Sequence, residues 1–244
     1  MLYDRNSHLY EPIFQNPSVI PLMYRFGISL GTGDASIGSA CACLGIDEIF
    51  FLDIINTYLN ETYNPQHPSL CDSTESILEY LEKTDIYYRD VQLPNVENHL
   101  NLLIGKSNNN NGNLNLLKGF FQEVKEEFTK LIFNDTEIWI PFLRKILKSR
   151  DEEQRKSLFQ AFISDTERKS PFDNSQLGEK LTDLLAFFTI HLHGDYNRNL
   201  CVAVVTAIFT LEKDVRQNAR IREKIFLPAV ANIVGGIDVL DDML

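Results

Sequence analysis

Apolar residues recur at the three- and four-residue steps of an α-helix over most of this chain. Because side chains at these steps share one helix face, each run predicts an amphipathic helix with a buried stripe. The clearest run consists of Leu117, Phe120, Phe121, Val124, Phe128, Leu131 and Ile132. In a later run, two polar residues interrupt the apolar stripe: Val204, Ile208, Leu211, Val215, Asn218, Arg222 and Ile225.

The second part of the chain is predicted to form four long helices, over 73–104, 117–147, 173–188 and 196–234. Bends are expected at Pro94 and Pro141, because proline removes a backbone donor and crowds the preceding turn. The charged stretch 149–171 is expected to be a connection with a helical turn or two over 158–163. This pattern favours an up-down four-helix bundle.

The segment 10–63 shows short apolar clusters separated by glycine, proline and polar residues. Such spacing predicts three or four short helices. Asp34 or Ser36 is expected to cap one of them, because its side-chain oxygen can accept from exposed amide groups, and Gly45 is expected to end it.

Pro65 and Pro68 stiffen the chain and stop any helix, so a domain boundary is expected between them. The predicted fold is therefore all-α. It consists of a small helical domain over 1–66 and a four-helix bundle over 67–244.

Charge and hydrophobicity narrow the functional classes. The 244 residues are 44% hydrophobic, which is ample for a buried core, and the net charge of -11 argues against nucleic-acid binding through these residues. The N-terminus is polar, and no apolar run reaches the roughly 18 residues that a membrane span needs. We expect no signal peptide, no membrane contact and a cytoplasmic protein.

The four cysteines, Cys41, Cys43, Cys71 and Cys201, lack the C-x-x-C spacing of a zinc or redox site. Their density is far below that of a disulfide scaffold, which also fits a reduced cytoplasm. In a helix, Cys41 and Cys43 would point about 200° apart. We therefore expect them to have a structural role.

Several short sequences resemble the di-iron proteins that repair iron–sulfur clusters. YRFGIS at 24–29 and LGID at 44–47 are similar to the small N-terminal domain of that family. The later part resembles the hemerythrin-like bundle of the same family through IYYR at 86–89, LP at 93–94, IWIP at 138–141 and IFLP at 225–228. The resemblance covers most of the chain and implies a hemerythrin-like arrangement for 67–244.

The resemblance also identifies what this chain has lost. In the family, adjacent cysteines follow the motif that Gly27-Ile28-Ser29 would match, whereas this chain has LGTGD at 30–34. The family's iron ligands are histidines and carboxylates, partly in H-x-x-x-E pairs. Counting back from the two later prolines places these pairs on Leu131 with Asp135 and on Asn218 with Arg222.

The two remaining helices offer Asp85 and either Glu179 or Lys180 at the positions of the ligands. Leucine cannot bind a metal, and a guanidinium brings positive charge to the place of two cations. The resemblance therefore implies a degenerate site. We predict no catalytic, cofactor-binding or metal-binding residues and no cofactor.

An arginine on a core-facing stripe needs a partner, and Asp85, Asp135 or Glu179 could pair with Arg222 in place of the metal. A replacement metal site from His99, His191 and Asp135 is the alternative. His191 and His193, with Asp195 close by, would point to different helix faces. We therefore favour a structural role for the histidines.

The expected function is a non-enzymatic regulatory, sensory or protein-interaction module, and one version is the sensor part of a transcriptional regulator. The alternative is a di-iron protein with shifted ligands that acts in iron–sulfur-cluster repair or in nitric oxide or oxygen sensing. A small-molecule sensor with an anion near Arg222 is a third option. The expected partner is an unknown protein or a small ligand, and a homodimer is among the options.

Overall fold

The computed structural model describes residues 1–65, 74–107, 112–149, 151–164 and 175–234. Within these ranges every regular element is a helix, and the only strand-like pairing is an isolated bridge between His8 and Ser36. The all-α prediction is therefore confirmed. None of the helices in these ranges is long and apolar enough to cross a membrane.

The chain divides into two compact units, each built from several segments. Unit 1 comprises Met1–Lys83, Asn134–Phe172 and Gln217–Leu244, and unit 2 comprises Thr84–Phe133 and Asp173–Arg216. The predicted boundary between residues 66 and 67 lies outside the described residues and stays a prediction.

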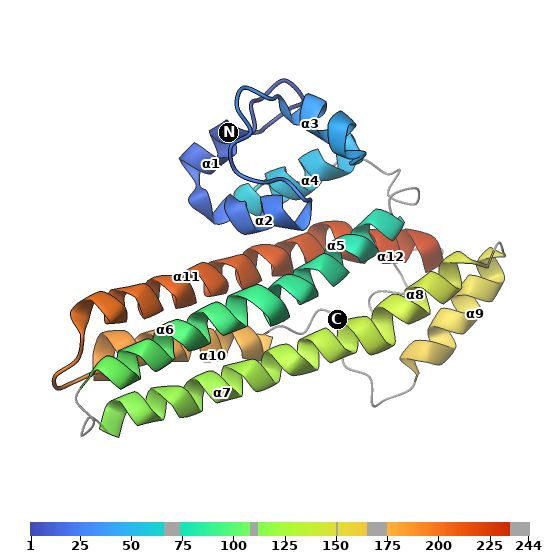
Figure 1. The fold of residues 1–244 in the computed structure, drawn as a ribbon. Helices are drawn as coiled ribbons and strands as arrows, with labels where there is room; N and C mark the ends of the chain where they lie inside the picture. The colour runs from blue at the N-terminus through green and yellow to red at the C-terminus, as the bar shows by residue number, and fades with distance from the viewer. Residues whose placement is uncertain (66–73, 108–111, 150, 165–174, 235–244) are drawn as a thin grey trace. The chain divides into compact units, whose positions relative to one another are not determined.

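Unit 1 begins with short helices whose ends follow the local sequence (Figure 1): α1 (Tyr10–Gln15), η1 (Pro17–Val19), α2 (Ile20–Arg25), α3 (Ile37–Leu44) and α4 (Glu48–Leu59). Ser36 caps α3 by accepting from the Ser39 amide, and Gly45 ends α3 with a φ of 67°. The Asp47 carboxylate caps α4. The predicted cap at Ser36 and the predicted end at Gly45 are confirmed.

The rest of unit 1 includes the first part of α5 (Thr74–Tyr87), α8 (Ile140–Leu147), α9 (Glu152–Ile163) and α12 (Leu227–Val234). Helix α12 packs against both α8 and α9. Arg144 of α8 forms ion pairs of 2.7 Å with Glu75 and Glu82 of α5. One continuous apolar core joins these helices to the short N-terminal ones.

Helix α9 is longer than the sequence pattern predicted. The Asp151 side chain accepts from the Glu153 amide, and acidic residues in the first turn suit the positive end of the helix dipole. Phe162 packs edge-on against Trp139 with ring centroids 4.9 Å apart. The charged stretch therefore begins a helix instead of a loop.

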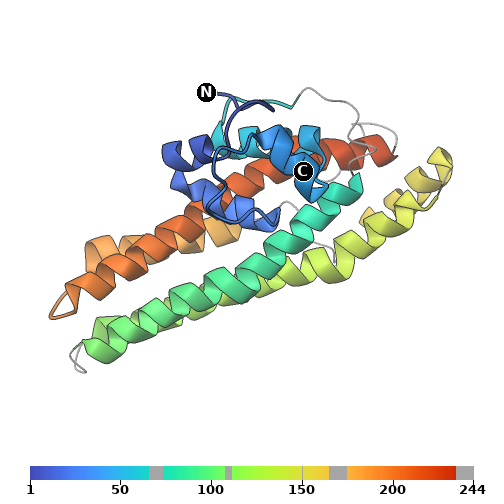
Figure 2. The ribbon, with the colours of Figure 1, turned by 45° about the horizontal axis from the view of Figure 1, so that its top comes forward.

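Unit 2 consists mainly of α6 (Leu93–Lys106), α7 (Gly112–Phe133), α10 (Ser175–Ala186) and the first part of α11 (Arg198–Ile221). Helix α7 packs against α6 and α10, and α11 contributes Val204, Ile208 and Leu211 to the same core (Figures 1 and 2). Lys125 of α7 reaches Glu97 of α6 at 2.9 Å. This unit therefore has its own apolar core and its own ion pairs.

In the part of the chain that the structure describes, four π-helical segments interrupt or end the long helices: η3 (Tyr88–Gln92), η4 (Asn134–Trp139), η5 (Phe187–His191) and η6 (Arg222–Phe226). Three of them directly precede a helix with proline at its second position. A proline ring crowds the carbonyl four residues earlier, and a wider π turn accommodates it without ending the helix. The helical path therefore continues through Pro94, Pro141 and Pro228.

Candidate functional site

The most unusual feature of unit 1 is an ion pair that lies entirely in its interior. The Arg222 guanidinium on η6 donates two hydrogen bonds to the Asp135 carboxylate on η4, one of them 3.2 Å long from Nη1 to Oδ1. The two residues are 3% and 1% exposed. This bidentate ion pair gives each carboxylate oxygen a hydrogen-bond donor, which partly offsets the free-energy cost of removing two charges from water.

A second buried contact lies one helical turn away along the same helix. The Tyr80 hydroxyl of α5 donates to the Asn218 side-chain oxygen at 2.5 Å. Phe26 stacks on Tyr80 with ring centroids 5.7 Å apart. We call Tyr80, Asp135, Asn218 and Arg222 the buried polar centre.

Three of these four residues were singled out by the sequence. Asp135, Asn218 and Arg222 stand at positions where the resemblance expects metal ligands, and the structure brings them into one buried region of unit 1. The predicted carboxylate partner of Arg222 is confirmed and is Asp135. Tyr80 was missed, although a tyrosine three residues after Ile77 on a core-facing stripe needs a partner for its hydroxyl.

The other candidate residues lie in unit 2. Leu131 is half-buried against the core of that unit, Asp85 is buried there, and Glu179 is exposed. Lys180 forms ion pairs with Glu123 and Glu127.

The histidines of unit 2 are not in its interior. His99 is half-buried, whereas His191, His193 and Asp195 are exposed. Among the described residues, no three His, Cys, Asp or Glu side chains are grouped closely enough to hold a metal ion.

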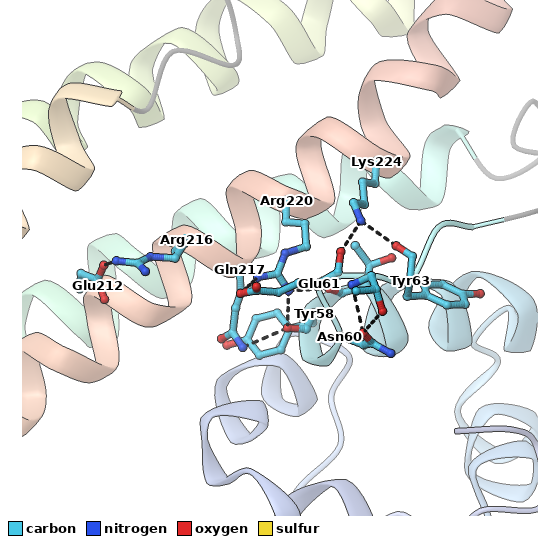
Figure 3. Close-up of polar contacts among 11 residues, drawn as sticks. Tyr58, Asn60, Glu61, Tyr63, Glu212, Arg216, Gln217, Arg220 and Lys224 are labelled. Atoms are coloured by element: carbon cyan, nitrogen blue, oxygen red, sulfur yellow. Dashed lines mark hydrogen bonds and ion pairs between the residues drawn. The ribbon is translucent and has the colours of Figure 1, made fainter. Parts of the chain in front are cut away.

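Gln217 and Arg220 of α11 and Lys224 of η6 form hydrogen bonds with the C-terminal end of α4 and the residues after it (Figure 3). Arg220 donates to the carbonyls of Thr57 and Tyr58, at 3.1 and 3.4 Å. Gln217 donates to the Tyr58 carbonyl at 3.0 Å. Lys224 donates to the carbonyls of Glu61 and Tyr63, at 2.6 and 2.8 Å.

The contacts to Thr57 and Tyr58 satisfy carbonyls in the last turn of α4, which a helix leaves unpaired, and the contacts of Lys224 bind the turn that follows. The positive charges of Arg220 and Lys224 suit the negative end of the α4 dipole. Arg220 also pairs with the Glu61 carboxylate at 2.8 Å. The sequence signal for these contacts is the polar series Gln217, Arg220 and Lys224 beside the apolar stripe, and it was missed.

The cysteines behave as the C-x-C spacing predicted, since Cys41 is buried and Cys43 is exposed. Burial, and then the nearby Glu48 and Asp47 charges, raise the pKa of the Cys41 thiol to about 11. Cys201 is half-buried, and burial raises the pKa of its thiol. Cys71 lies outside the described residues.

The burial of Cys41 and the exposure of Cys43 predict that a thiol reagent modifies the two cysteines selectively. At pH 8, a thiol with a pKa of about 11 is thiolate in only about one molecule in a thousand, and the thiolate is the nucleophile. We expect iodoacetamide to modify Cys43 in the native protein and Cys41 only after denaturation, as read by peptide mass spectrometry. Equal rates at the two residues in native protein would contradict the described burial.

The buried polar centre has the chemistry of a structural contact. Both oxygens of Asp135 accept from Arg222, and the Asn218 oxygen accepts from Tyr80. An arginine stays protonated at any physiological pH, so it cannot act as a base or bind a cation.

In comparisons with known proteins, no family model, no curated protein and no solved structure matches this chain.

Proposed function

We propose that this chain is a metal-free, non-enzymatic relative of the di-iron proteins that repair iron–sulfur clusters. On this proposal, residues 1–66 correspond to the small N-terminal domain of that family and residues 67–244 to its hemerythrin-like bundle. The chain works in the cytoplasm as a regulatory, sensory or protein-interaction module, and one form of this role is the sensor part of a transcriptional regulator.

The observation that supports this proposal most strongly is the ion pair between Arg222 and Asp135. Counted from Pro228 and Pro141, the two residues stand at ligand positions of the family. A hemerythrin-type centre needs anionic and imidazole ligands around two cations. Here one guanidinium supplies the positive charge, and a single carboxylate neutralises it inside a packed core.

The contact of Asn218 with Tyr80 supports the same proposal. Asn218 stands where the resemblance expects a histidine, and its oxygen is already engaged by the Tyr80 hydroxyl. Asn218 and Arg222, which stand at the two expected ligand positions of this helix, therefore both bind other side chains of the protein. A bundle whose interior is occupied in this way retains its outer faces for recognition.

The proposal predicts that metal ions do not stabilise the native protein. We would measure the thermal unfolding midpoint of the full chain, under anaerobic conditions, with and without two equivalents of Fe²⁺ or Zn²⁺. A ligand that binds only the native state stabilises it by about 2.7 kcal/mol at a hundred times its Kd. We expect no upward shift for the wild-type protein.

A matched variant shows whether this measurement can detect binding. The double substitution Asn218→His and Arg222→Glu introduces an imidazole and a carboxylate beside Asp135, which gives three metal-binding side chains. We expect this variant to be less stable than wild type without metal and to gain stability with Zn²⁺. An upward shift of the wild-type protein with Fe²⁺, together with absorbance from an oxo-bridged iron pair, would instead support a di-iron protein with shifted ligands.

A further inference from the structure

The first nine residues contain no helix and bind to the helices of unit 1 that follow them. The Tyr3 amide donates to Asn56 Oδ1 at 2.8 Å, and Asn56 Nδ2 donates to the Tyr3 carbonyl at 2.9 Å. One side chain of α4 therefore binds both backbone groups of a single residue. A side-chain amide can form this pair with the backbone of any residue except proline.

Further backbone contacts continue along the same segment. The Gly38 amide donates to the Arg5 carbonyl and the Ile37 amide to the Ser7 carbonyl, each at 2.9 Å. Gly38 also allows the close approach, because a Cβ at this position would lie 3.2 Å from the Arg5 carbonyl oxygen. Recognition through main-chain hydrogen bonds, with a pocket for a single side chain, is typical of sites that bind extended peptides.

Tyr3 supplies the side chain that such a site needs. It is 6% exposed within the apolar core of unit 1, and its hydroxyl donates to Gln15 Oε1 at 2.7 Å. Asn56 is equally buried, at 4% exposed. A buried amide without partners is costly, so a peptide backbone against Asn56 is strongly favoured over an empty site.

The middle of the segment places few demands on sequence. Asp4, Arg5 and Asn6 are exposed. The Asp4 carboxylate accepts from the amides of Asn6 and Ser7, which are contacts within the segment itself. Arg5 pairs with Glu48 at 3.6 Å, and such an exposed pair adds little affinity. The site therefore selects an aromatic residue and a peptide backbone.

We propose that Gln15, Gly38 and Asn56, which we call the segment site, form a peptide-binding site that the chain's own residues 1–9 occupy. Its second occupant is an extended segment of a partner protein with an aromatic residue in the place of Tyr3. The two occupants exclude each other, so the chain's own segment regulates the interaction. This inference rests on the interaction role proposed above, but it uses other residues than the buried polar centre.

The test uses the full chain and a fluorescently labelled peptide of residues 1–9, MLYDRNSHL, with binding measured by fluorescence anisotropy. The wild-type protein should bind this probe weakly, because its own segment occupies the site. Tyr3→Ala in the protein removes the buried side chain of that segment and should tighten probe binding roughly ten-fold, since the site is open in more of the molecules. A probe that itself carries Tyr3→Ala should not bind measurably.

Two further substitutions, each combined with Tyr3→Ala in the protein, test the segment site. Asn56→Ala removes the side-chain amide, and Gly38→Ala places a Cβ against the bound backbone. Each should weaken probe binding roughly ten-fold. Leu44→Ala is the control, because Leu44 is 49% exposed at the other end of α3 from Gly38 and should leave binding unchanged.

Circular dichroism confirms that each variant is folded, and Gly38→Ala keeps the test decisive if Asn56→Ala unfolds the protein. A Tyr3→Ala protein that binds the probe no better than wild type would overturn the proposal. Binding that neither Asn56→Ala nor Gly38→Ala weakens would also overturn it. Metal bound to the same protein would contradict the proposed function without changing this result, so the two failures are distinguishable.

Discussion

Replacing Arg222 with alanine is expected to lower the free energy of unfolding by about 3–5 kcal/mol, because it leaves the Asp135 carboxylate buried without its counter-charge. Both side chains are almost completely buried, so water cannot replace the lost guanidinium without opening the core. Chemical denaturation followed by circular dichroism measures the effect. The loss should be the largest of any single arginine substitution in this chain.

Two controls separate the buried charge from general damage. Arg216→Ala removes an exposed arginine of the same helix that pairs with Glu212, and it should cost less than about 0.5 kcal/mol. The double variant Asp135→Leu with Arg222→Met removes both charges and should recover much of the stability lost in Arg222→Ala. A small effect of Arg222→Ala, similar to that of Arg216→Ala, would contradict the buried pair.

Phe128→Ala is expected to destabilise the protein by about 3–5 kcal/mol through a cavity in the core of unit 2. Phe128 is 0% exposed, and its ring packs edge-on against Tyr88 with centroids 5.0 Å apart. Hydrogen exchange should show the loss of protection along α7 and α6. Denaturation measures the total change.

Phe133 provides a matched control on the same helix. It is 58% exposed, so Phe133→Ala should change the stability by less than about 0.5 kcal/mol. If the two substitutions destabilised the protein equally, the described burial along α7 would be wrong.

The sequence predicted the helices and most of their inward faces because these depend on local periodicity. Leu117, Phe121, Val124 and Phe128 are buried as expected. Phe120 is the exception, since it is 40% exposed although it belongs to the predicted stripe. The apolar stripe of α7 is wider than the face that the neighbouring helices cover. Phe120 lies at the edge of this stripe.

The features that escaped prediction depend on contacts between distant segments. Asp85, Asp135 and Glu179 were equally available to Arg222 in the sequence, and only the packing of η4 against η6 selects Asp135, which is 87 residues away. The hydrogen bond from Arg220 to the Thr57 carbonyl of α4 joins residues that are 163 positions apart in the sequence. No local pattern specifies which chain segments meet at these places.

The π segments also went unpredicted, because a proline within a helical pattern is normally read as a bend or an end. In η3 and η6 the chain instead adds one residue to the turn: the amides of Leu93 and Leu227 donate to the carbonyls five residues earlier, on Tyr88 and Arg222. Each π turn therefore lets a helix pass a proline.

The most direct test of the central claim is the metal content of the full chain, expressed with ample iron and zinc and purified without chelators. Elemental analysis should find far less than one equivalent of any transition metal, because Arg222 and Asp135 satisfy each other in the interior. One or two equivalents of iron or zinc that remain bound through gel filtration would contradict it.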